Sequence, residues 1–355
     1  MSTEDSKAFS EKIKAATAEE RPLRIRGGGT KDFYGNALEG EVLDTRGHAG
    51  IVDYEPTELV LTARCGTPLS ELHEVLEKQG QFLPFEPPGF GPAATLGGCI
   101  AAGLSGPRRA SAGSVRDFVL GATILDGRGQ LLAFGGRVMK NVAGYDVSRL
   151  LAGSLGTLGL ILEVSLKVLP RPPTELTLTL ELPQAKALES MNRWAGMPLP
   201  ISASAWHDGE LSLRLSGAQS AIRAAADKLA GETVTAAQAT QFWDAVREQT
   251  DPFFATDVPL WRLSLPSNAP VVDLPGEQLL EWGGALRWLK SGADAGIVRS
   301  AAARAGGQAT LFRATEKPAG AFAPLAKELA RLHRELKQSF DPAGILNPRR
   351  LYPEF

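Results

Sequence analysis

The sequence predicts an α+β protein of about two domains. Its 355 residues exceed one typical hydrophobic core. An alternating apolar strand at residues 159–169 ends at Pro170, and the proline-rich linker that follows indicates the end of a domain. From residue 175 to about 319, strands interleave with helices, as in a second α+β domain. We therefore divide the chain into residues 1–172, residues 173–320 and a C-terminal segment, residues 321–355.

The first domain is expected to begin with short strands and one well-marked helix. Strands are predicted within residues 19–31, 41–45 and 58–63, with a turn around Pro56 before the last of them. Thr67 fits the N-cap and Pro68 the first position of a helix that should end at Gly80. The apolar residues Leu69, Leu72 and Leu76 fall on one face of this helix.

The remaining elements follow from alternation and helical periodicity. In the first domain we expect an extended segment at 81–84, a hairpin of 117–125 and 131–134 around the turn 126–129, and a short helix at 146–152. The second domain should contain strands at 176–182, 201–206 and 211–215, and helices at 188–195, 218–229 and 239–248. A C-terminal amphipathic helix at 324–340, with Leu325, Leu329, Leu332 and Leu336 on one face, precedes an extended segment at 345–352.

Composition excludes several classes of protein. A formal net charge of -2 gives no basic excess for nucleic acid or an anionic membrane. The first residues lack a basic and then apolar leader, so a cytoplasmic location is expected, and no apolar run is long enough for a membrane helix, so membrane contact is at most peripheral. Two cysteines exclude a cysteine-ligated iron–sulfur cluster within this chain, and the four histidines show no metal-binding spacing.

The most informative segment is a glycine loop that follows the first predicted strand. It consists of Gly27, Gly28 and Gly29, flanked by Arg26 and by Thr30 and Lys31. Glycine adopts positive φ freely and lets a ligand approach the main chain, and successive main-chain N–H groups in a turn form an anion-binding concavity. Such a loop suits a pyrophosphate.

Two further glycine clusters strengthen this interpretation. They occupy residues 94–106 and 153–159 of the same domain. A dinucleotide needs main-chain N–H groups along its pyrophosphate and small residues where its rings lie against backbone. Residues 89–94 formally fit the GxGxxA pattern of a Rossmann site, but this match follows Pro87-Pro88 and contains Pro92, whereas Rossmann glycines follow a strand and open a helix.

The combined motifs resemble the FAD-binding domain of the vanillyl-alcohol oxidase superfamily, the PCMH-type domain. They are RGGGTK at 26–31, the run from Pro88 through ATLGG, GSVRD at 113–117, NVAGYD at 141–146, the cluster 153–159 and FDPAGILNP at 340–348. The resemblance implies an FAD-binding domain of two subdomains, a smaller α+β cap domain over the flavin, and a C-terminal segment that returns to the FAD domain. It is strongest with flavin-binding subunits of bacterial glycolate oxidase, and it includes the cap segments 241–243, 260–266 and 281–290.

The resemblance also implies the residues that bind FAD. Gly27, Gly28, Gly29, Thr30 and Lys31 would bind the pyrophosphate; Pro88, Thr95, Leu96, Gly97 and Gly98 would lie beside the phosphates and flavin; Gly113, Ser114 and Asp117 would line the ribityl and adenosine region; Gly159 and Ile161 would present backbone groups; and Asn347 would approach the flavin. The first loop has no His or Cys, so the FAD is expected to be non-covalent, and Cys99 is expected to be a small buried residue. No metal is expected.

No catalytic residue can be assigned from the sequence. Oxidation of a 2-hydroxy acid needs a base for the hydroxyl proton and usually an Arg for the carboxylate. Family members that oxidise these acids themselves carry a histidine-rich stretch in or after the cap, which this chain lacks. Arg262, Arg287 and Arg313 are the candidate carboxylate ligands. For His207 and His333 a structural role is preferred, and for Tyr145 packing and chemistry are equally expected.

The leading hypothesis is an FAD-binding subunit of a complex that oxidises glycolate to glyoxylate, paired with a larger flavin subunit and an iron–sulfur subunit. Two locations are considered for the tryptophans of the second domain: a surface that binds a partner, or the hydrophobic core, which is the more common location. These residues are Trp243, Trp261, Trp282 and Trp288. The alternatives are a self-sufficient FAD-dependent 2-hydroxy acid dehydrogenase and a non-catalytic assembly subunit. No feature identifies an NADPH site for a reductase.

Overall fold

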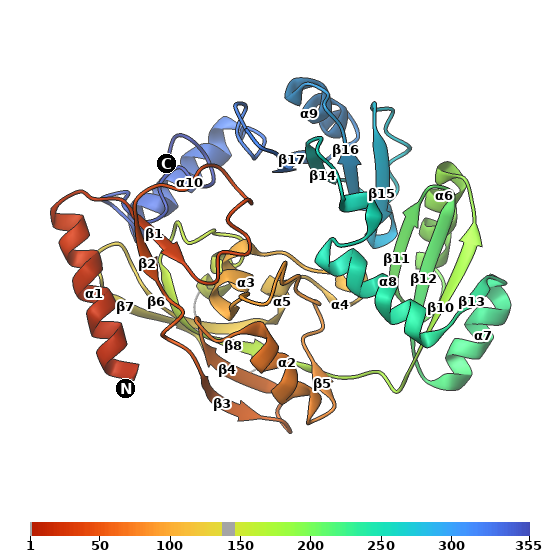
Figure 1. Cartoon of the computed structure of the whole chain (residues 1–355), viewed down its shortest axis with the longest axis horizontal. Coiled ribbons are helices and arrows are strands. Elements are labelled where there is room, and N and C mark those ends of the chain that lie inside the picture. Colours follow the sequence, from red (N-terminus) through yellow and green to blue (C-terminus); the bar gives the residue numbers. More distant parts are fainter. Residues whose placement is uncertain (1, 137–145) are drawn as a thin grey trace.

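Two large β-sheets and two small two-stranded sheets organise the described residues, and the computed structural model describes residues 2–136 and 146–355 (Figure 1). The N-terminal part contains α1 (Ser2–Ala18) and the parallel pair β1 (Leu23–Arg26) and β2 (Glu41–Asp44). Helix α1 was not predicted. Its buried residues Ile13 and Ala16 pack in one cluster with Leu43 and Leu160, while most of the helix is exposed. Because so few of its residues are buried, the sequence of α1 shows only a weak helical pattern of apolar residues.

The first large sheet has five strands in antiparallel order. They are β3 (Ile51–Glu55), β4 (Val60–Arg64), β8 (Leu160–Lys167), β6 (Val119–Leu125) and β7 (Leu131–Gly135). The predicted hairpin of β6 and β7 is confirmed. The prediction of only a turn before β4 was incomplete, because Ile51 to Glu55 form strand β3 and pair with Val60 to Ala63. The turn around Pro56 connects these two strands.

Short helices and a two-stranded sheet surround the five-stranded sheet. They are α2 (Leu69–Glu77), β5 (Gln81–Phe82), α3 (Leu96–Ala102), α4 (Arg109–Ala112), α5 (Val115–Phe118), η1 (Val147–Leu151) and β9 (Leu169–Pro170), which pairs with β5. Helix α2 buries its three leucines as its periodicity indicates. The predicted N-cap was wrong: Pro68 occupies that position, and the Thr67 hydroxyl instead donates to the Arg64 carbonyl at 2.7 Å.

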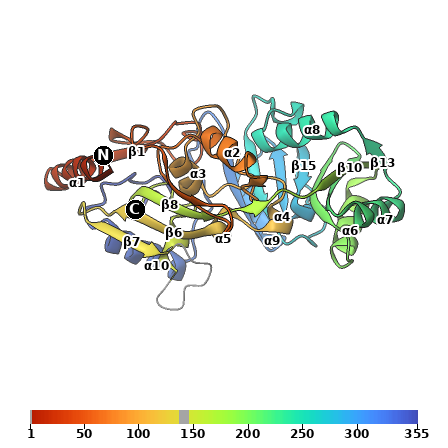
Figure 2. The ribbon, with the colours of Figure 1, turned by 90° about the horizontal axis from the view of Figure 1, so that it is seen from below.

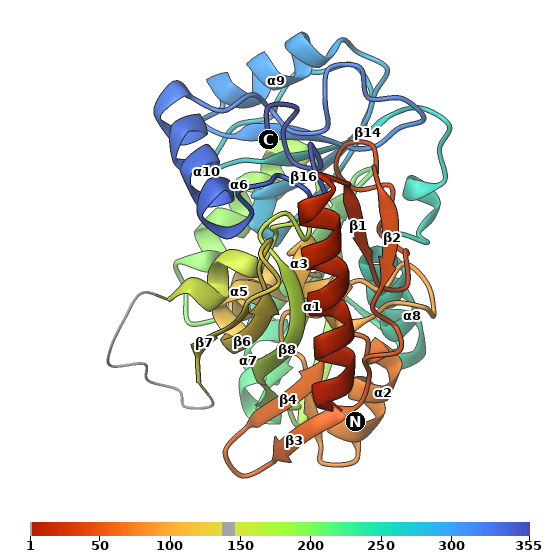
Figure 3. The ribbon, with the colours of Figure 1, turned by 90° about the vertical axis from the view of Figure 1, so that its left-hand side faces the viewer.

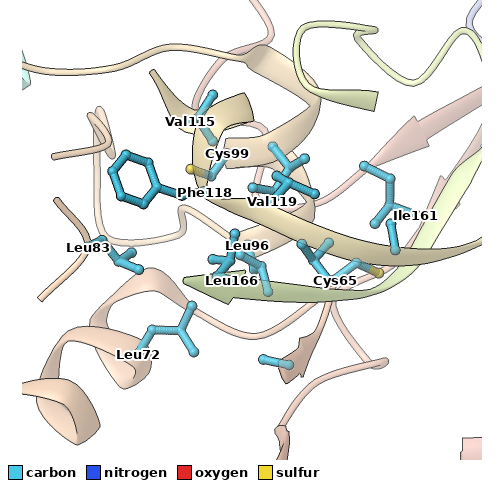
Figure 4. Close-up of a cluster of buried hydrophobic side chains, with 14 of the residues drawn as sticks. Cys65, Leu72, Leu83, Leu96, Cys99, Val115, Phe118, Val119, Ile161 and Leu166 are labelled. Atoms are coloured by element: carbon cyan, nitrogen blue, oxygen red, sulfur yellow. The ribbon is translucent and has the colours of Figure 1, made fainter. Parts of the chain in front are cut away.

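The core of this domain lies between these helices and the sheet. Figure 4 shows Leu72 of α2, Leu96 and Cys99 of α3, and Leu166 of β8 turned toward one another. Cys99 is buried, as expected, and burial raises the pKa of its thiol to about 11. It is therefore part of the packing.

The second large sheet has eight strands, all antiparallel to their neighbours. In order they are β13 (Glu232–Val234), β10 (Thr174–Glu181), β12 (Glu210–Gly217), β11 (Ile201–His207), β15 (Glu277–Glu281), β16 (Leu286–Lys290), β14 (Leu260–Ser264) and β17 (Gln308–Arg313). Its helices are α6 (Gln184–Ala195), α7 (Gln219–Leu229), α8 (Ala236–Glu248) and α9 (Ala295–Arg304), with short turns η2 (Pro252–Phe254) and η3 (Trp282–Gly284).

The two faces of the eight-stranded sheet have different coverings. Leu213, Leu280, Leu289 and Trp261 lie on the face covered by α6, α7 and α9. Helix α8 lies on the opposite face, as Figure 2 shows, where Trp243 packs against small residues of β11. Leu260, Leu279 and Trp288 also lie on this second face and pack against Leu104 and Leu155 of the N-terminal half. The second face therefore meets the first domain.

The C-terminal segment returns to the start of the chain. Helix α10 (Lys327–Phe340) lies at the same end of the molecule as β1 (Figures 1 and 3). The Leu23 N–H donates to the Ile345 carbonyl at 2.7 Å, and the Asn347 N–H donates to the Leu23 carbonyl at 2.9 Å. These bonds extend the pair β1 and β2 by a third segment.

Helix α10 packs differently from the expectation for an amphipathic helix. Its residues Leu329 and Leu332 are 44% and 53% exposed, whereas Lys337 is buried. The Lys337 ammonium donates to the Thr157 carbonyl at 2.9 Å, the Leu346 carbonyl at 2.8 Å and the Asp341 carboxylate at 2.6 Å. Of the predicted apolar face, Leu336 packs against the core of the first domain, so the side of the helix that faces the protein carries Leu336 and Lys337 rather than Leu329 and Leu332. Among the described residues, no helix has the length and apolar character needed to cross a membrane.

Candidate cofactor site

The glycine loop presents free main-chain donors. None of the N–H groups of residues 27–31 donates a hydrogen bond to another described residue. The loop lines a cavity of about 80 Å³ together with Thr95, Gly98, Asn347 and Arg350. Five successive donors without acceptors at a cavity form a site for an anion with several oxygens, such as a pyrophosphate.

The loop also lies directly on a neighbouring segment of backbone. A Cβ atom on Gly28 would lie 1.5 Å from the Ala93 carbonyl oxygen, and one on Gly27 would lie 2.3 Å from Thr95 Oγ1. Gly29 has a φ of 73°. Only glycine fits this close approach and this conformation. The shape of the loop therefore requires glycine at these three positions, because a side chain there would collide with neighbouring atoms or strain the backbone.

Polar side chains hold both ends of the loop. Asn347 accepts a hydrogen bond from the Ile25 N–H at 2.7 Å and donates to the Leu155 carbonyl at 2.6 Å. The buried Arg350 guanidinium donates to the carbonyls of Asp32, at 2.8 Å, Tyr34 and Asn36. Burial lowers the pKa of Arg350 to about 10. Sequence reasoning missed Arg350, although it follows Asn347 by only three residues, just beyond the closing motif.

Replacement of Arg350 is expected to weaken cofactor binding. Arg350→Gln removes the donors that hold residues 32–36, so FAD affinity should fall about tenfold, the cost of about one hydrogen bond to a charged group. Titration of the flavin-free protein with FAD, followed by flavin fluorescence, measures this change. Arg349→Gln is the matched control, because Arg349 is exposed and its side chain pairs with the surface residue Glu39. Equal affinities of the two variants would contradict the assignment.

Residues 95–98 at the start of α3 face two different parts of the molecule. Thr95 and Gly98 line the glycine-loop cavity, and Thr95 Oγ1 accepts the Gly98 N–H at 3.3 Å. Leu96 is fully buried, and the Gly97 N–H donates to the Cys65 carbonyl at 2.7 Å. The structure therefore places Thr95 and Gly98 at the loop, while Leu96 and Gly97 attach α3 to the core.

The other predicted cofactor residues lie outside this cavity. Pro88 lines a small cavity against the cap. Ser114 and Asp117 form a capping box at the start of α5, and the Ser114 N–H donates to the Asp117 carboxylate at 2.8 Å. Gly113 precedes the N-cap residue Ser114 of this helix, Gly159 lies immediately before β8, and Ile161 is the second residue of β8. Residues 141–145 of the NVAGYD motif, including Tyr145, lie outside the described residues.

Comparison with known proteins identifies the family. Residues 2–135 match the family described as FAD binding domain. Over 349 residues the chain is 51% identical to glycolate oxidase subunit GlcE of Escherichia coli (strain K12), and the match covers 98% of each chain. The chain belongs to the GlcE family. The motif-based resemblance, the α+β fold class with a PCMH-type FAD-binding domain, and FAD as the cofactor are thereby confirmed.

More distant relatives match this GlcE-family chain over shorter stretches or in fold. Glycolate oxidase subunit GlcD of Bacillus subtilis (strain 168) is 33% identical over 159 residues, which are 44% of this chain and 34% of that one. The solved structure of alkyldihydroxyacetonephosphate synthase has a TM-score of 0.66 at 16% identity and covers 96% of this chain and 75% of that one. This likeness shows the shared fold.

Most of the other residues singled out in the sequence of this GlcE-family protein have structural contacts. Arg287 is fully buried and donates to three main-chain carbonyls, of Ala269, Pro270 and Gly284, so it is not available to a substrate. Arg313 donates to Gln249 at 3.0 Å. His207 contacts Glu277, and the His333 ring contacts Tyr352 and Phe355.

The four tryptophans of the cap lie in the interior. Trp243, Trp261, Trp282 and Trp288 are each 5% exposed or less. Their indole N–H groups all have acceptors, such as the Gly106 carbonyl for Trp282 at 3.0 Å. Of the two expectations for these residues, core packing is therefore correct and a partner surface is wrong.

Proposed function

We propose that this chain is the FAD-binding subunit of a glycolate oxidase complex that oxidises glycolate to glyoxylate. The observation that carries the proposal is the row of N–H groups at residues 27–31 without acceptors among the described residues, in a loop that only glycine can form. The identity with a protein named as a glycolate oxidase subunit supports the reaction. Relatives named D-lactate dehydrogenase and D-2-hydroxyglutarate dehydrogenase support the wider substrate class of 2-hydroxy acids.

The residues of this chain would hold FAD along the path that the motifs suggest. Residues 27–31 would donate to the pyrophosphate, with Thr95 and Gly98 beside its phosphates. Pro88, Leu96 and Gly97 would support this path from outside the cavity. Gly113, Ser114 and Asp117 line the adenosine side, Gly159 and Ile161 offer backbone groups, and Asn347 orients the loop through the Ile25 N–H. FAD, when bound, supplies an acceptor for two electrons. The division into residues 1–172, 173–320 and 321–355 assigns cofactor binding to the first and last segments.

The complex is proposed to include a larger flavin-binding subunit and an iron–sulfur subunit. The printed names of GlcE and GlcD both describe subunits of glycolate oxidase. A cysteine-ligated cluster needs more thiolates than this chain contains, because Cys65 and Cys99 are its only cysteines. Transfer of electrons onward through iron and sulfur therefore requires a second protein.

The flavin spectrum tests this function. The purified chain is expected to show bound flavin, and glycolate added without oxygen should bleach that flavin in the complex with the larger flavin subunit. Absence of flavin from the chain, both alone and in the complex, would refute the proposal. Bleaching of the chain alone would assign the oxidation to this chain and support the self-sufficient dehydrogenase.

A further inference from the structure

A carboxylate of the cap contacts the main chain of the first domain. Glu248 is the last residue of α8, and its Oε2 accepts the Gly89 N–H at 3.0 Å and the Phe90 N–H at 2.8 Å. Hydrogen bonds from N–H groups to a carboxylate are about twice as strong as those between neutral groups. The contact therefore joins α8 of the cap firmly to residues 89–90 of the FAD-binding domain.

The position of Glu248 is unfavourable for α8 itself. The C-terminus of a helix carries a partial negative charge, so a carboxylate there destabilises the helix. The Arg247 Nε donates to Glu248 Oε1 at 2.9 Å and offsets part of this effect. Helix stability therefore does not account for Glu248, whereas its two main-chain partners in the first domain do.

The segment that Glu248 contacts has one attached end and a strained centre. The Ala94 carbonyl accepts the Leu69 N–H of α2 at 2.9 Å. Phe90, by contrast, has a φ of 55°, a conformation that residues other than glycine rarely adopt. Such a conformation persists only where surrounding contacts impose it. The bond from the Phe90 N–H to Glu248 is a contact of this kind, so the cap helps to fix the shape of residues 89–94.

The same segment holds the last residue of the glycine loop. The Lys31 ammonium donates to the Gly89 carbonyl at 3.1 Å and lies 5.4 Å from the centroid of the Phe90 ring. Lys31 also lines the glycine-loop cavity. Gly89 thus donates its N–H to Glu248 and accepts from Lys31 through its carbonyl. One residue connects a negative charge of the cap with a positive charge of the cofactor loop.

From this series of contacts we infer that Glu248 is a positioning residue for FAD, which sets the place of the Lys31 ammonium beside the pyrophosphate through Gly89 and Phe90. Glu248 fixes the two peptide groups, these fix Lys31, and Lys31 supplies the positive charge. The cap thereby takes part in cofactor binding through the main chain of the first domain. This inference rests on the proposed function, in which residues 27–31 would bind the pyrophosphate.

Removal of the carboxylate should weaken FAD binding. Glu248→Ala is expected to lower the affinity about tenfold, whereas Glu248→Gln should lose less, because its amide oxygen can still accept an N–H group. Titration of the flavin-free chain with FAD measures both effects. The matched control is Asp227→Asn, which removes an exposed negative charge on α7 of the cap and should bind FAD like the wild type. Thermal unfolding shows whether each variant is folded. Equal affinities of Glu248→Ala and the wild type would overturn the inference.

A double-mutant cycle with Lys31→Met distinguishes a positioning role from general support of the fold. If Glu248 acts through Lys31, the loss of Glu248 has little further effect once the ammonium is gone. The FAD affinities of Lys31→Met and of the double variant with Glu248→Ala should then agree within about twofold. If Glu248 only supported the fold, the two single effects would multiply. That result would overturn the inference.

Lys31 itself reports the contact in the absence of FAD. Burial lowers the pKa of its ammonium, while the neighbouring Cys99 and Glu248 raise it, and the Arg350 guanidinium contacts the Lys31 carbonyl. Because a nearby negative charge favours the ammonium, Glu248→Ala should lower the pKa of Lys31 further. NMR of the flavin-free chain with carbon-13 at the lysine ε-carbons measures this pKa, and Lys31→Met identifies the signal. An unchanged pKa would contradict the positioning role.

The outcomes separate this inference from the proposed function. Multiplying effects in the cycle, or an unchanged Lys31 pKa in Glu248→Ala, would overturn the role of Glu248 and leave FAD binding by the wild-type chain intact. A wild-type chain that binds no FAD, both alone and in the complex, would instead overturn the proposed function and this inference with it.

Discussion

Gly28→Ala is expected to yield a folded chain that no longer binds FAD. The added Cβ would lie 1.5 Å from the Ala93 carbonyl oxygen, which is main chain and cannot turn away. The loop must move, and the N–H groups of residues 27–31 then no longer line the cavity in the same arrangement. Loss of two charge-assisted hydrogen bonds, at about 1.5 kcal/mol or more each, corresponds to an affinity at least about 100-fold lower. The flavin content after purification and the titration with FAD measure this effect.

Gly47→Ala is the matched control for this variant. No heavy atom lies within 4 Å of the position that a Cβ atom on Gly47 would occupy, and its φ is not positive, so an alanine fits there. The control should retain FAD. Both variants should keep the near-UV circular dichroism of the buried cap tryptophans, because the cap sheet does not include the loop. Full flavin occupancy in Gly28→Ala would refute the role of the loop.

Lys337→Met should lower the free energy of unfolding by about 3–5 kcal/mol. Lys337 and Asp341 are 6% and 1% exposed, and their pair is 2.6 Å long. Without the ammonium, the Asp341 carboxylate stays buried with only main-chain N–H partners, and the Thr157 and Leu346 carbonyls lose a donor. Urea unfolding followed by tryptophan fluorescence measures the difference.

Lys327→Met makes the same change in charge at the exposed start of the same helix. A surface substitution of this kind usually changes stability by less than about 0.5 kcal/mol. If both variants unfold at the same urea concentration, the buried ammonium does not anchor α10. Because α10 leads into the segment that carries Asn347, the Lys337 variant should also hold FAD more weakly.

Local patterns predicted the elements whose residues face one core. The hairpin of β6 and β7, the leucines of α2 and the strand before the glycine loop all follow from short stretches of sequence. Helix α10 does not. Of its four-leucine pattern, Leu336 packs against the core, but Leu329 and Leu332 are exposed. The acceptors for Lys337 come from residues 157, 341 and 346, and no local rule places all three beside the helix.

In the candidate site, too, some residues could be predicted from local sequence and others could not. Residues 27–31 were predictable, because the need for glycine is a property of the backbone itself. Arg350 was not, since the carbonyls that it holds lie more than 300 residues earlier. Arg262 is one of three candidate arginines in the sequence, but its place opposite Trp288 depends on the register of β14 and β16. Register between distant strands is set by tertiary packing.

The attachment of residues 345–350 to β1 also sets an order of events during synthesis. The ribosome releases the N-terminal part first, and domains begin to fold as they emerge. Yet Leu23 pairs with Ile345 and Asn347, and Arg350 holds the turn after the glycine loop. A nascent chain can therefore build both sheets while its nucleotide cradle is still unfinished. FAD binding is therefore expected to follow the synthesis of residues 345–350, because the glycine loop is held in place only after these residues have been made.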